Sequence, residues 1–180
     1  MATPPKPSVD PFNVFVHAER FYWADHYLRD ERMPQDHCFF MAPVALVLNA
    51  LSAELYLKCL LRIEHDKAPA THDLKDLFDR LPAPTRATIQ RKWDAQKIER
   101  RLIEDQVDAL LDTKVPRSLD YALETGRLGF NELRYHYELG EGGSIYWLSD
   151  LSTIIRETIM ERKPEWIPPQ NRIRPTFRGH

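Results

Sequence analysis

The sequence is short of cysteine, the residue that cross-links small secreted domains and builds zinc clusters. Its 180 residues include only Cys38 and Cys59. Their separation fits neither a zinc knuckle nor a disulfide framework, so we expect free thiols in a cytoplasmic protein. The scattered histidines lack the short spacing of metal ligands, so we expect no metal and no cofactor.

Glycine is also scarce, at 6 residues, and its one cluster is not a phosphate-binding loop. The stretch GEGGS, residues 140–144, lacks both the lysine and the preceding strand of such a loop. No segment reads convincingly as a β-strand, and no repeat or heptad is present.

A large excess of charge of one sign is missing as well. The formal net charge of −2 argues against a protein held to nucleic acid by its global charge. A local basic patch remains possible. The N-terminal stretch MATPPKPSVDPF has one lysine and no apolar run, so we expect no signal peptide.

One long apolar run is present, from Met41 to Ile63, and it is long enough to span a bilayer. Glu54 and Lys58 near its middle would each cost roughly 2.5–3.5 kcal/mol on insertion scales. We therefore expect a helix of the protein core and no membrane partner.

The apolar periodicity predicts an all-α, up-and-down helical bundle. We expect a flexible leader over residues 1–11, a single bundle domain over 12–162 and a Pro/Arg-rich flexible tail over 163–180. Gly126 and Gly129 interrupt the pattern between residues 119 and 137, which predicts two helical pieces with a bend. The other helices are expected over residues 12–29, 43–64 (with Pro43 in the first turn), 73–81, 85–111 and 145–161.

The helix expected over 43–64 carries an unusual pair of charges. Glu54 and Lys58 are four residues apart, with the glutamate first, which is the favourable order for an ion pair. One interpretation is that the pair faces solvent and contributes little. The other is that Glu54 faces a polar seam, where a buried carboxylate needs partners. His72 and Arg134 are the candidate partners.

Three stretches together resemble HEPN-domain proteins, which are small prokaryotic helical bundles. They are Ala53-Glu54-x-x-x-Lys58, then His72-Asp73-Leu74, then Arg134-Tyr135-x-Tyr137-Glu138. The resemblance implies frequent homodimers and a link to RNA or nucleotides. It also implies genetic neighbours of the toxin–antitoxin, phage-defence or nucleotidyltransferase type, so a nucleotidyltransferase-type partner protein is one expectation.

Ribonucleases of that family use an arginine followed, after four to six residues, by a histidine. A histidine can serve as general acid or base on a 2′-hydroxyl, and an arginine stabilises phosphate charge. Here Arg134 is followed by His136 only two positions later. Catalysis would need Arg134 with His136 or His72, or the correctly spaced Arg20 and His26 on the first helix.

Three functions therefore stay open. The first is a non-catalytic homodimeric module that binds RNA, nucleotide or a partner protein. The second is a metal-independent endoribonuclease of toxin or defence type, and the third is a scaffold with a buried polar seam. The expected seam residues are Glu54, Lys58, His72, Asp73, Arg134, Tyr135, Tyr137 and Glu138.

The C-terminal tail is a further candidate for binding nucleic acid. After Glu165 it contains no acidic residue, while Arg172, Arg174 and Arg178 recur among aromatic residues. Such a segment can bind RNA or an acidic groove and fold as it binds. A disordered end is the alternative.

Overall fold

The protein is all-α, as the sequence predicts. The computed structural model describes residues 9–30, 32–96, 114, 116–135, 148 and 150–166, without the side chains at 38 and 39. This part of the chain contains helices and no strand. In chain order they are α1 (Pro11–Leu28), α2 (Gln35–His65), α3 (Leu74–Asp79), a helix over 83–96, α5 (Leu119–Thr125), α6 (Gly129–Arg134), α7 (Leu151–Arg162) and the short 3₁₀ helix η3 (Pro164–Trp166).

Helix α1 begins and ends within one residue of its predicted limits. Asp10 caps it, because its side chain accepts a hydrogen bond from the Phe12 amide at 3.0 Å. Pro11 occupies the first turn, where its missing N–H has no cost and its fixed φ suits a helix. One face is buried, including Phe15, Ala18 and Tyr22.

Helix α2 is longer than the sequence predicts, and the predicted start at Pro43 is wrong. The helix begins at Gln35, directly after Pro34, and contains Pro43 in its interior. A proline inside a helix removes one backbone hydrogen bond, but the turns on either side keep theirs. The helix ends at His65, and the residue that follows, Asp66, has a φ of 58°, in the left-handed region.

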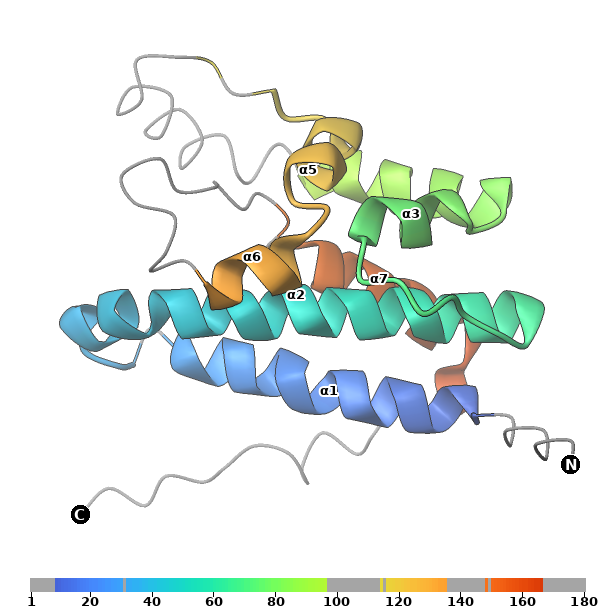
Figure 1. Ribbon diagram of the computed structural model, residues 1–180. Coiled ribbons are helices and arrows are strands. Elements are labelled where there is room, and N and C mark those ends of the chain that lie inside the picture. Colours follow the sequence, from blue (N-terminus) through green and yellow to red (C-terminus); the bar gives the residue numbers. More distant parts are fainter. Residues whose placement is uncertain are drawn as a thin grey trace, which may run out of the picture.

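Helices α1, α2 and α7 pack side by side around the core (Figure 1). Helix α1 runs antiparallel to α2. Helix α7 runs parallel to α2, because Ser152 at its start bonds Asn49 and Arg162 at its end bonds Glu64. Trp166 of η3 then packs on Phe12 and closes one end of the core. The largest fully buried side chains here include Phe15, Tyr56, Leu57, Leu60, Leu61 and Leu151.

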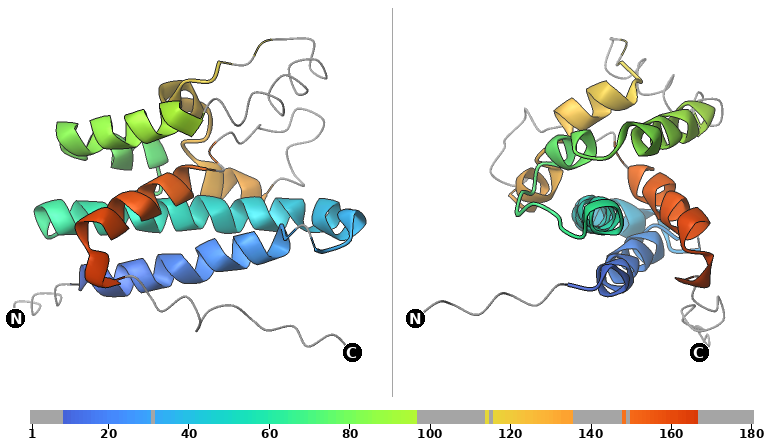
Figure 2. Two further views of the ribbon diagram at one scale, coloured as in Figure 1. Left: turned by 180° about the vertical axis from the view of Figure 1, so that it is seen from behind. Right: turned by 90° about the vertical axis from the view of Figure 1, so that its right-hand side faces the viewer.

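The remaining helices cover the other side of α2 and α7 (Figure 2). The 83–96 helix begins two residues before the predicted start and lies along α7, to which Lys92 is joined by ion pairs with Glu157 and Glu161. The predicted continuation of this helix to residue 111 lies outside the described residues.

The bend between α5 and α6 is as predicted. Helix α5 ends at Gly126, whose N–H donates to the Ala122 carbonyl at 2.9 Å. A Cβ added at Gly126 would lie 2.7 Å from Cδ1 of Leu148, so glycine permits this close approach. In contrast, the predicted helix over 145–161 starts too early, because α7 begins at Leu151 and both Leu148 and Asp150 lie outside the helix. Residues 145–147 lie outside the described part.

One helix in the described part, Phe40–His65, is long and apolar enough to cross a membrane. Within the protein, 61% of its most apolar window is buried. Burial against α1, α6 and α7 accounts for most of this hydrophobicity.

Candidate functional site

Glu54 is the buried centre of a small polar cluster beside α6. Only 2% of its side chain is exposed, so the interpretation that Glu54 faces solvent is wrong. The side chain points from α2 toward the loop that precedes α3. Lys58 Nζ donates to Oε1 at 2.7 Å, one turn further along the helix. A buried carboxylate needs such partners, and the lysine neutralises its charge.

His72 is the second partner of Glu54. Its Nδ1 lies 3.0 Å and 3.1 Å from the two carboxylate oxygens, and 52% of its side chain is exposed. A carboxylate can only accept, so Nδ1 carries the proton. In neutral imidazole Nε2 is then the acceptor. Glu54 thus fixes both the orientation of the ring and its tautomer.

Helix α6 brings an aromatic ring and a cation to the same place. The rings of His72 and Phe130 have centroids 6.1 Å apart, and the Arg134 guanidinium lies 4.6 Å from the Phe130 centroid. Phe130 therefore lies next to both groups, and it brings the Arg134 guanidinium and the His72 imidazole to the same part of the surface. We call Glu54, Lys58, His72, Phe130 and Arg134 the His72 site.

Arg134 does not contact Glu54, which corrects one predicted pairing. Its guanidinium donates to Oδ1 of Asn131 at 3.1 Å and also lies over the Tyr135 ring. Arg134 and Tyr135 are both exposed. The Arg134 side chain extends along the surface of its own helix instead.

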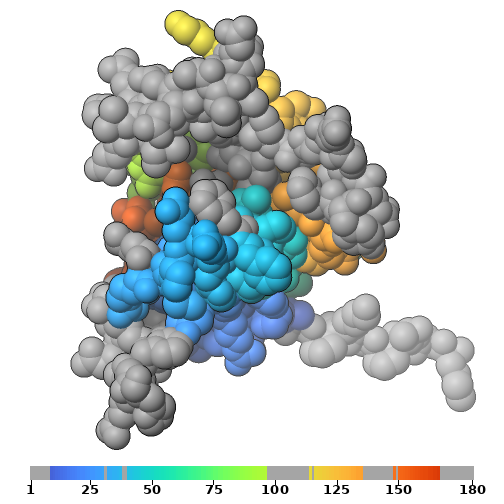
Figure 3. Space-filling view, turned by 90° about the vertical axis from the view of Figure 1, so that its left-hand side faces the viewer, coloured from blue at the N-terminus to red at the C-terminus, as the bar shows by residue number. Residues whose placement is uncertain are grey.

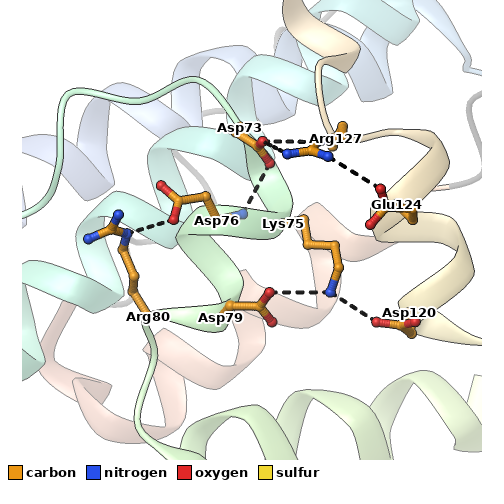
Figure 4. Close-up of polar contacts among 8 residues, drawn as sticks. All are labelled: Asp73, Lys75, Asp76, Asp79, Arg80, Asp120, Glu124 and Arg127. Atoms are coloured by element: carbon orange, nitrogen blue, oxygen red, sulfur yellow. Dashed lines mark hydrogen bonds and ion pairs between the residues drawn. The ribbon is translucent and has the colours of Figure 1, made fainter.

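An ion pair holds the His72 loop against the start of α6. Arg127 donates to Oδ2 of Asp73 through Nε at 2.9 Å and Nη2 at 2.6 Å, and its carbonyl accepts from the Leu74 amide at 2.8 Å (Figure 4). Asp73 also caps α3 by accepting from the Asp76 amide at 3.0 Å. The partial burial of Asp73 would raise its pKa, but the hydrogen bonds from Arg127 and the cap lower it below its ordinary value.

A second ion pair extends this contact between α3 and α5. Lys75 Nζ lies between Asp79 of its own helix and Asp120 of α5, at 3.2 Å and 3.0 Å (Figure 4). Both carboxylates are exposed, so this pair contributes little stability. It links α3 to α5 at the surface.

Arg20 and His26 do not form a second catalytic pair. Six residues apart on α1, they point about 120° away from each other around the helix axis. Arg20 is exposed, whereas Nδ1 of His26 lies 3.0 Å from the Tyr22 carbonyl. Burial lowers the pKa of His26 below its ordinary value.

Several predicted residues have no described position. The C-terminal arginines and the end of the aromatic stretch after α6 lie outside the described residues. These are His136, Tyr137, Glu138, Arg172, Arg174 and Arg178.

A larger buried polar network was not predicted from the sequence. Glu19 of α1 accepts four hydrogen bonds, from Trp23 Nε1, from the Tyr56 hydroxyl, and from Nε and Nη2 of Arg156. Burial, with the Glu19 charge, raises the pKa of Tyr56 far above its ordinary value. All acceptor positions of Glu19 are used, so this network joins α1, α2 and α7 and is not a site for a ligand.

Asp25 is the second acidic residue that the sequence analysis missed. It is fully buried, and its Oδ2 accepts from Arg29 and, at 2.9 Å, from Asn49. The available signal was its place on the apolar face of α1, three residues after Tyr22. Acidic residues at positions that periodicity assigns to the core indicate buried ion pairs.

No cluster of three or more potential metal ligands occurs among the described residues. Comparisons of the chain with models of protein families, with curated proteins and with solved structures found no match. The resemblance to HEPN-domain proteins therefore stays a prediction from the residues that carry it.

Proposed function

We propose that the protein is a HEPN-like helical module that binds RNA or a nucleotide through the His72 site. The observation that carries this proposal is the grouping of an oriented histidine, in the loop before α3, with an aromatic ring and an exposed arginine of α6. Arginine and protonated histidine suit a phosphate, and Phe130 and Tyr135 offer faces on which a base can stack.

The charges of the site agree with an anionic ligand. Glu54 and Lys58 neutralise each other, which leaves the Arg134 charge for a ligand, and protonation of His72 would add a second. The scaffold alternative requires Arg134 to be buried and paired with Glu54, whereas it is exposed and bonded to Asn131.

The first test is the binding of a fluorescently labelled single-stranded RNA, measured by anisotropy in EDTA at several salt concentrations. We expect Arg134→Ala to weaken binding about tenfold, the loss of one charged hydrogen bond. The slope of log K against log salt should fall by about 0.7. Arg80→Ala is the matched control, because Arg80 is an exposed arginine that pairs with Asp76 on α3, away from the site. Equal affinity in the wild type and Arg134→Ala would contradict the proposal.

A metal-independent endoribonuclease is the second candidate, and the geometry of His72 favours it over the Arg20/His26 alternative. A histidine whose Nδ1 is held by a buried carboxylate has its Nε2 available as a general base for a 2′-hydroxyl. Arg134 would stabilise the charge on the phosphate. The 2′-oxygen would form a bond to phosphorus as the P–O5′ bond breaks, which gives a 2′,3′-cyclic phosphate and a 5′-hydroxyl protonated from solvent.

Cleavage of the same RNA in EDTA separates the two candidates. For a ribonuclease, His72→Gln should abolish cleavage and largely keep binding, and Glu54→Gln should lower the cleavage rate through loss of ring orientation. Circular dichroism of each variant controls for folding. An RNA that is bound but not cut would leave the binding module as the function.

A further inference from the structure

The His72 site is assembled from segments that lie far apart in the sequence. His72 belongs to the loop before α3 and is oriented by Glu54 of α2. Phe130 and Arg134 belong to α6, which lies at the surface beside α2, in orange and cyan in Figure 3. The tilted ring contact between His72 and Phe130, at 6.1 Å, is weak. A stronger contact must therefore hold the His72 loop at this distance from α6.

The residue that follows His72 makes such a contact. Oδ2 of Asp73 accepts hydrogen bonds from Nε and Nη2 of Arg127, at 2.9 Å and 2.6 Å (Figure 4). The Arg127 carbonyl accepts from the Leu74 amide at 2.8 Å. The side chain and the main chain of one residue thus bind two consecutive residues of the loop. We call these three hydrogen bonds the Asp73 clamp.

The Asp73 clamp joins the loop to the start of the helix that carries the rest of the site. Arg127 lies two residues before α6, and Phe130 and Arg134 are four residues apart on one face of that helix. The Asp73 side chain is only 14% exposed, so water competes less for this ion pair than for a fully exposed one. The clamp therefore links the position of the imidazole to that of the guanidinium.

We propose that Asp73 and Arg127 are positioning residues of the His72 site, which favour the binding of an anion although Asp73 is itself negatively charged. The clamp holds His72 beside Phe130 and Arg134 before a ligand arrives. Less of the loop then has to be ordered on binding, which raises affinity. This inference rests on the proposed function and assigns part of the RNA affinity to residues that do not touch the ligand.

Direct electrostatics makes the opposite prediction for one of the two residues. A carboxylate close to an anion site repels the ligand, so loss of the Asp73 charge would strengthen RNA binding. Loss of the Arg127 charge would weaken it. If the clamp acts by positioning, both losses weaken binding, because both break the same ion pair. The sign of the Asp73 effect therefore separates the two explanations.

The RNA anisotropy assay in EDTA tests this sign. Asp73→Asn keeps an oxygen to cap α3, and Arg127→Gln keeps the carbonyl that binds Leu74. We expect each to weaken binding about threefold to tenfold, the cost of ordering a side chain on binding. The double variant should bind no more weakly than either single variant, because the same contact is lost. The slope of log K against log salt should stay as in the wild type, since no phosphate contact is removed.

Asp120→Asn is the matched control. It removes a carboxylate of the same side of the molecule, paired with Lys75, and leaves the clamp intact. Its affinity should stay within about twofold of the wild type, since Asp120 is an exposed charge. Tighter binding by Asp73→Asn would overturn the proposal. So would a slope that falls by about 0.7 in Arg127→Gln, which would make Arg127 a phosphate ligand.

A measurement without RNA lets the inference and the proposed function fail separately. The Phe130 ring shifts the NMR signals of the His72 ring protons, which can be recorded at high pH, where imidazole is neutral. We expect these signals to move toward unstructured-peptide values in Arg127→Gln and to stay in place in Asp120→Asn. Unchanged His72 signals in Arg127→Gln would overturn the positioning role even if RNA binds. A wild type that binds no RNA would contradict the proposed function, and the signals alone would then decide whether the clamp positions His72.

Discussion

At the scale of single residues, buried carboxylates organise this protein. Glu19 holds Arg156, Tyr56 and Trp23, and Glu54 holds Lys58 and His72. The two differ in what surrounds them. The Glu19 partners are mostly enclosed, whereas His72 reaches the surface. The first cluster therefore serves stability, and the second can serve a ligand.

Removing the charge of Glu19 should destabilise the fold strongly. Glu19→Gln leaves the Arg156 guanidinium, only 15% exposed, without its anion. Breaking a buried ion pair from one side costs about 3–5 kcal/mol. Urea unfolding followed by circular dichroism measures the change in the free energy of unfolding.

Two further variants control for this result. Glu124→Gln removes an exposed carboxylate that pairs with Arg127, and it should cost less than about 1 kcal/mol. Glu19→Gln combined with Arg156→Met should recover part of the loss, since no unpaired charge then remains. A loss for Glu19→Gln as small as that of Glu124→Gln would show that water reaches the cluster.

Sequence reasoning found Glu54 and missed Glu19 for a physical reason. Glu54 has a lysine one turn later and a histidine at the start of the next helix, so its partners are local or predictable. The main partner of Glu19 is Arg156, which is 137 residues away. Pairings of that range depend on how α1 and α7 pack, and no local pattern contains them.

At the scale of elements, α3 illustrates how a short helix is held in place. Six residues are too few to form a stable helix alone. Asp73 caps α3 and binds Arg127, and Leu74 and Leu77 are buried beneath it. The cap, the ion pair and the burial together position the loop with His72.

Asp73 should contribute stability that depends on pH. Asp73→Ala removes the cap and the ion pair and should cost about 1 kcal/mol near neutral pH. Asp73→Asn keeps a capping oxygen but loses the charge, so its cost should be smaller. Urea unfolding at several pH values measures both.

The pH dependence has a definite sign. Because the pKa of Asp73 is lowered in the folded state, its charge stabilises the fold above the unfolded-state value of about 3.9. The contribution declines as the pH falls through the lower folded-state pKa. The difference between the wild type and Asp73→Asn should therefore vanish in acid. A difference that persists there would assign the effect to packing.

The helices themselves were largely predictable, and the largest error, at the start of α2, involves a proline. The Gly126 bend and the Asp73 cap follow from local chemistry, and both are observed. The start of α2 was misplaced by eight residues, because Pro43 looks the same from the sequence whether it begins a helix or lies inside one. The packing of the neighbouring turns decides that question.

At the scale of the whole molecule, α2 is the central helix, against which α1, α3, α6 and α7 all pack. It contributes Tyr56, Leu57 and Leu60 to the core and Glu54 to the His72 site. Its exposed apolar residues are Phe40 and Val44. The sequence predicts this helix as part of the core, but a helix that is apolar on every side gives no signal of which side its neighbours cover. The packing of α1, α6 and α7 decides that.

The first and last described elements meet, since the rings of Phe12 and Trp166 have centroids 5.4 Å apart. The ends of the described fold are therefore close enough to be joined, which would allow the order of the helices along the chain to be rearranged. A circular permutant that joins Trp166 to Asp10 by a short linker and begins at Met33 would move α1 to the end of the chain. The new opening lies in a turn where the Arg32 side chain is 83% exposed, so only weak surface contacts are lost.

We expect the permutant to keep the far-ultraviolet circular dichroism of the parent and cooperative unfolding in urea. Loss of cooperative unfolding would mean that the core needs the covalent connection between α1 and α2.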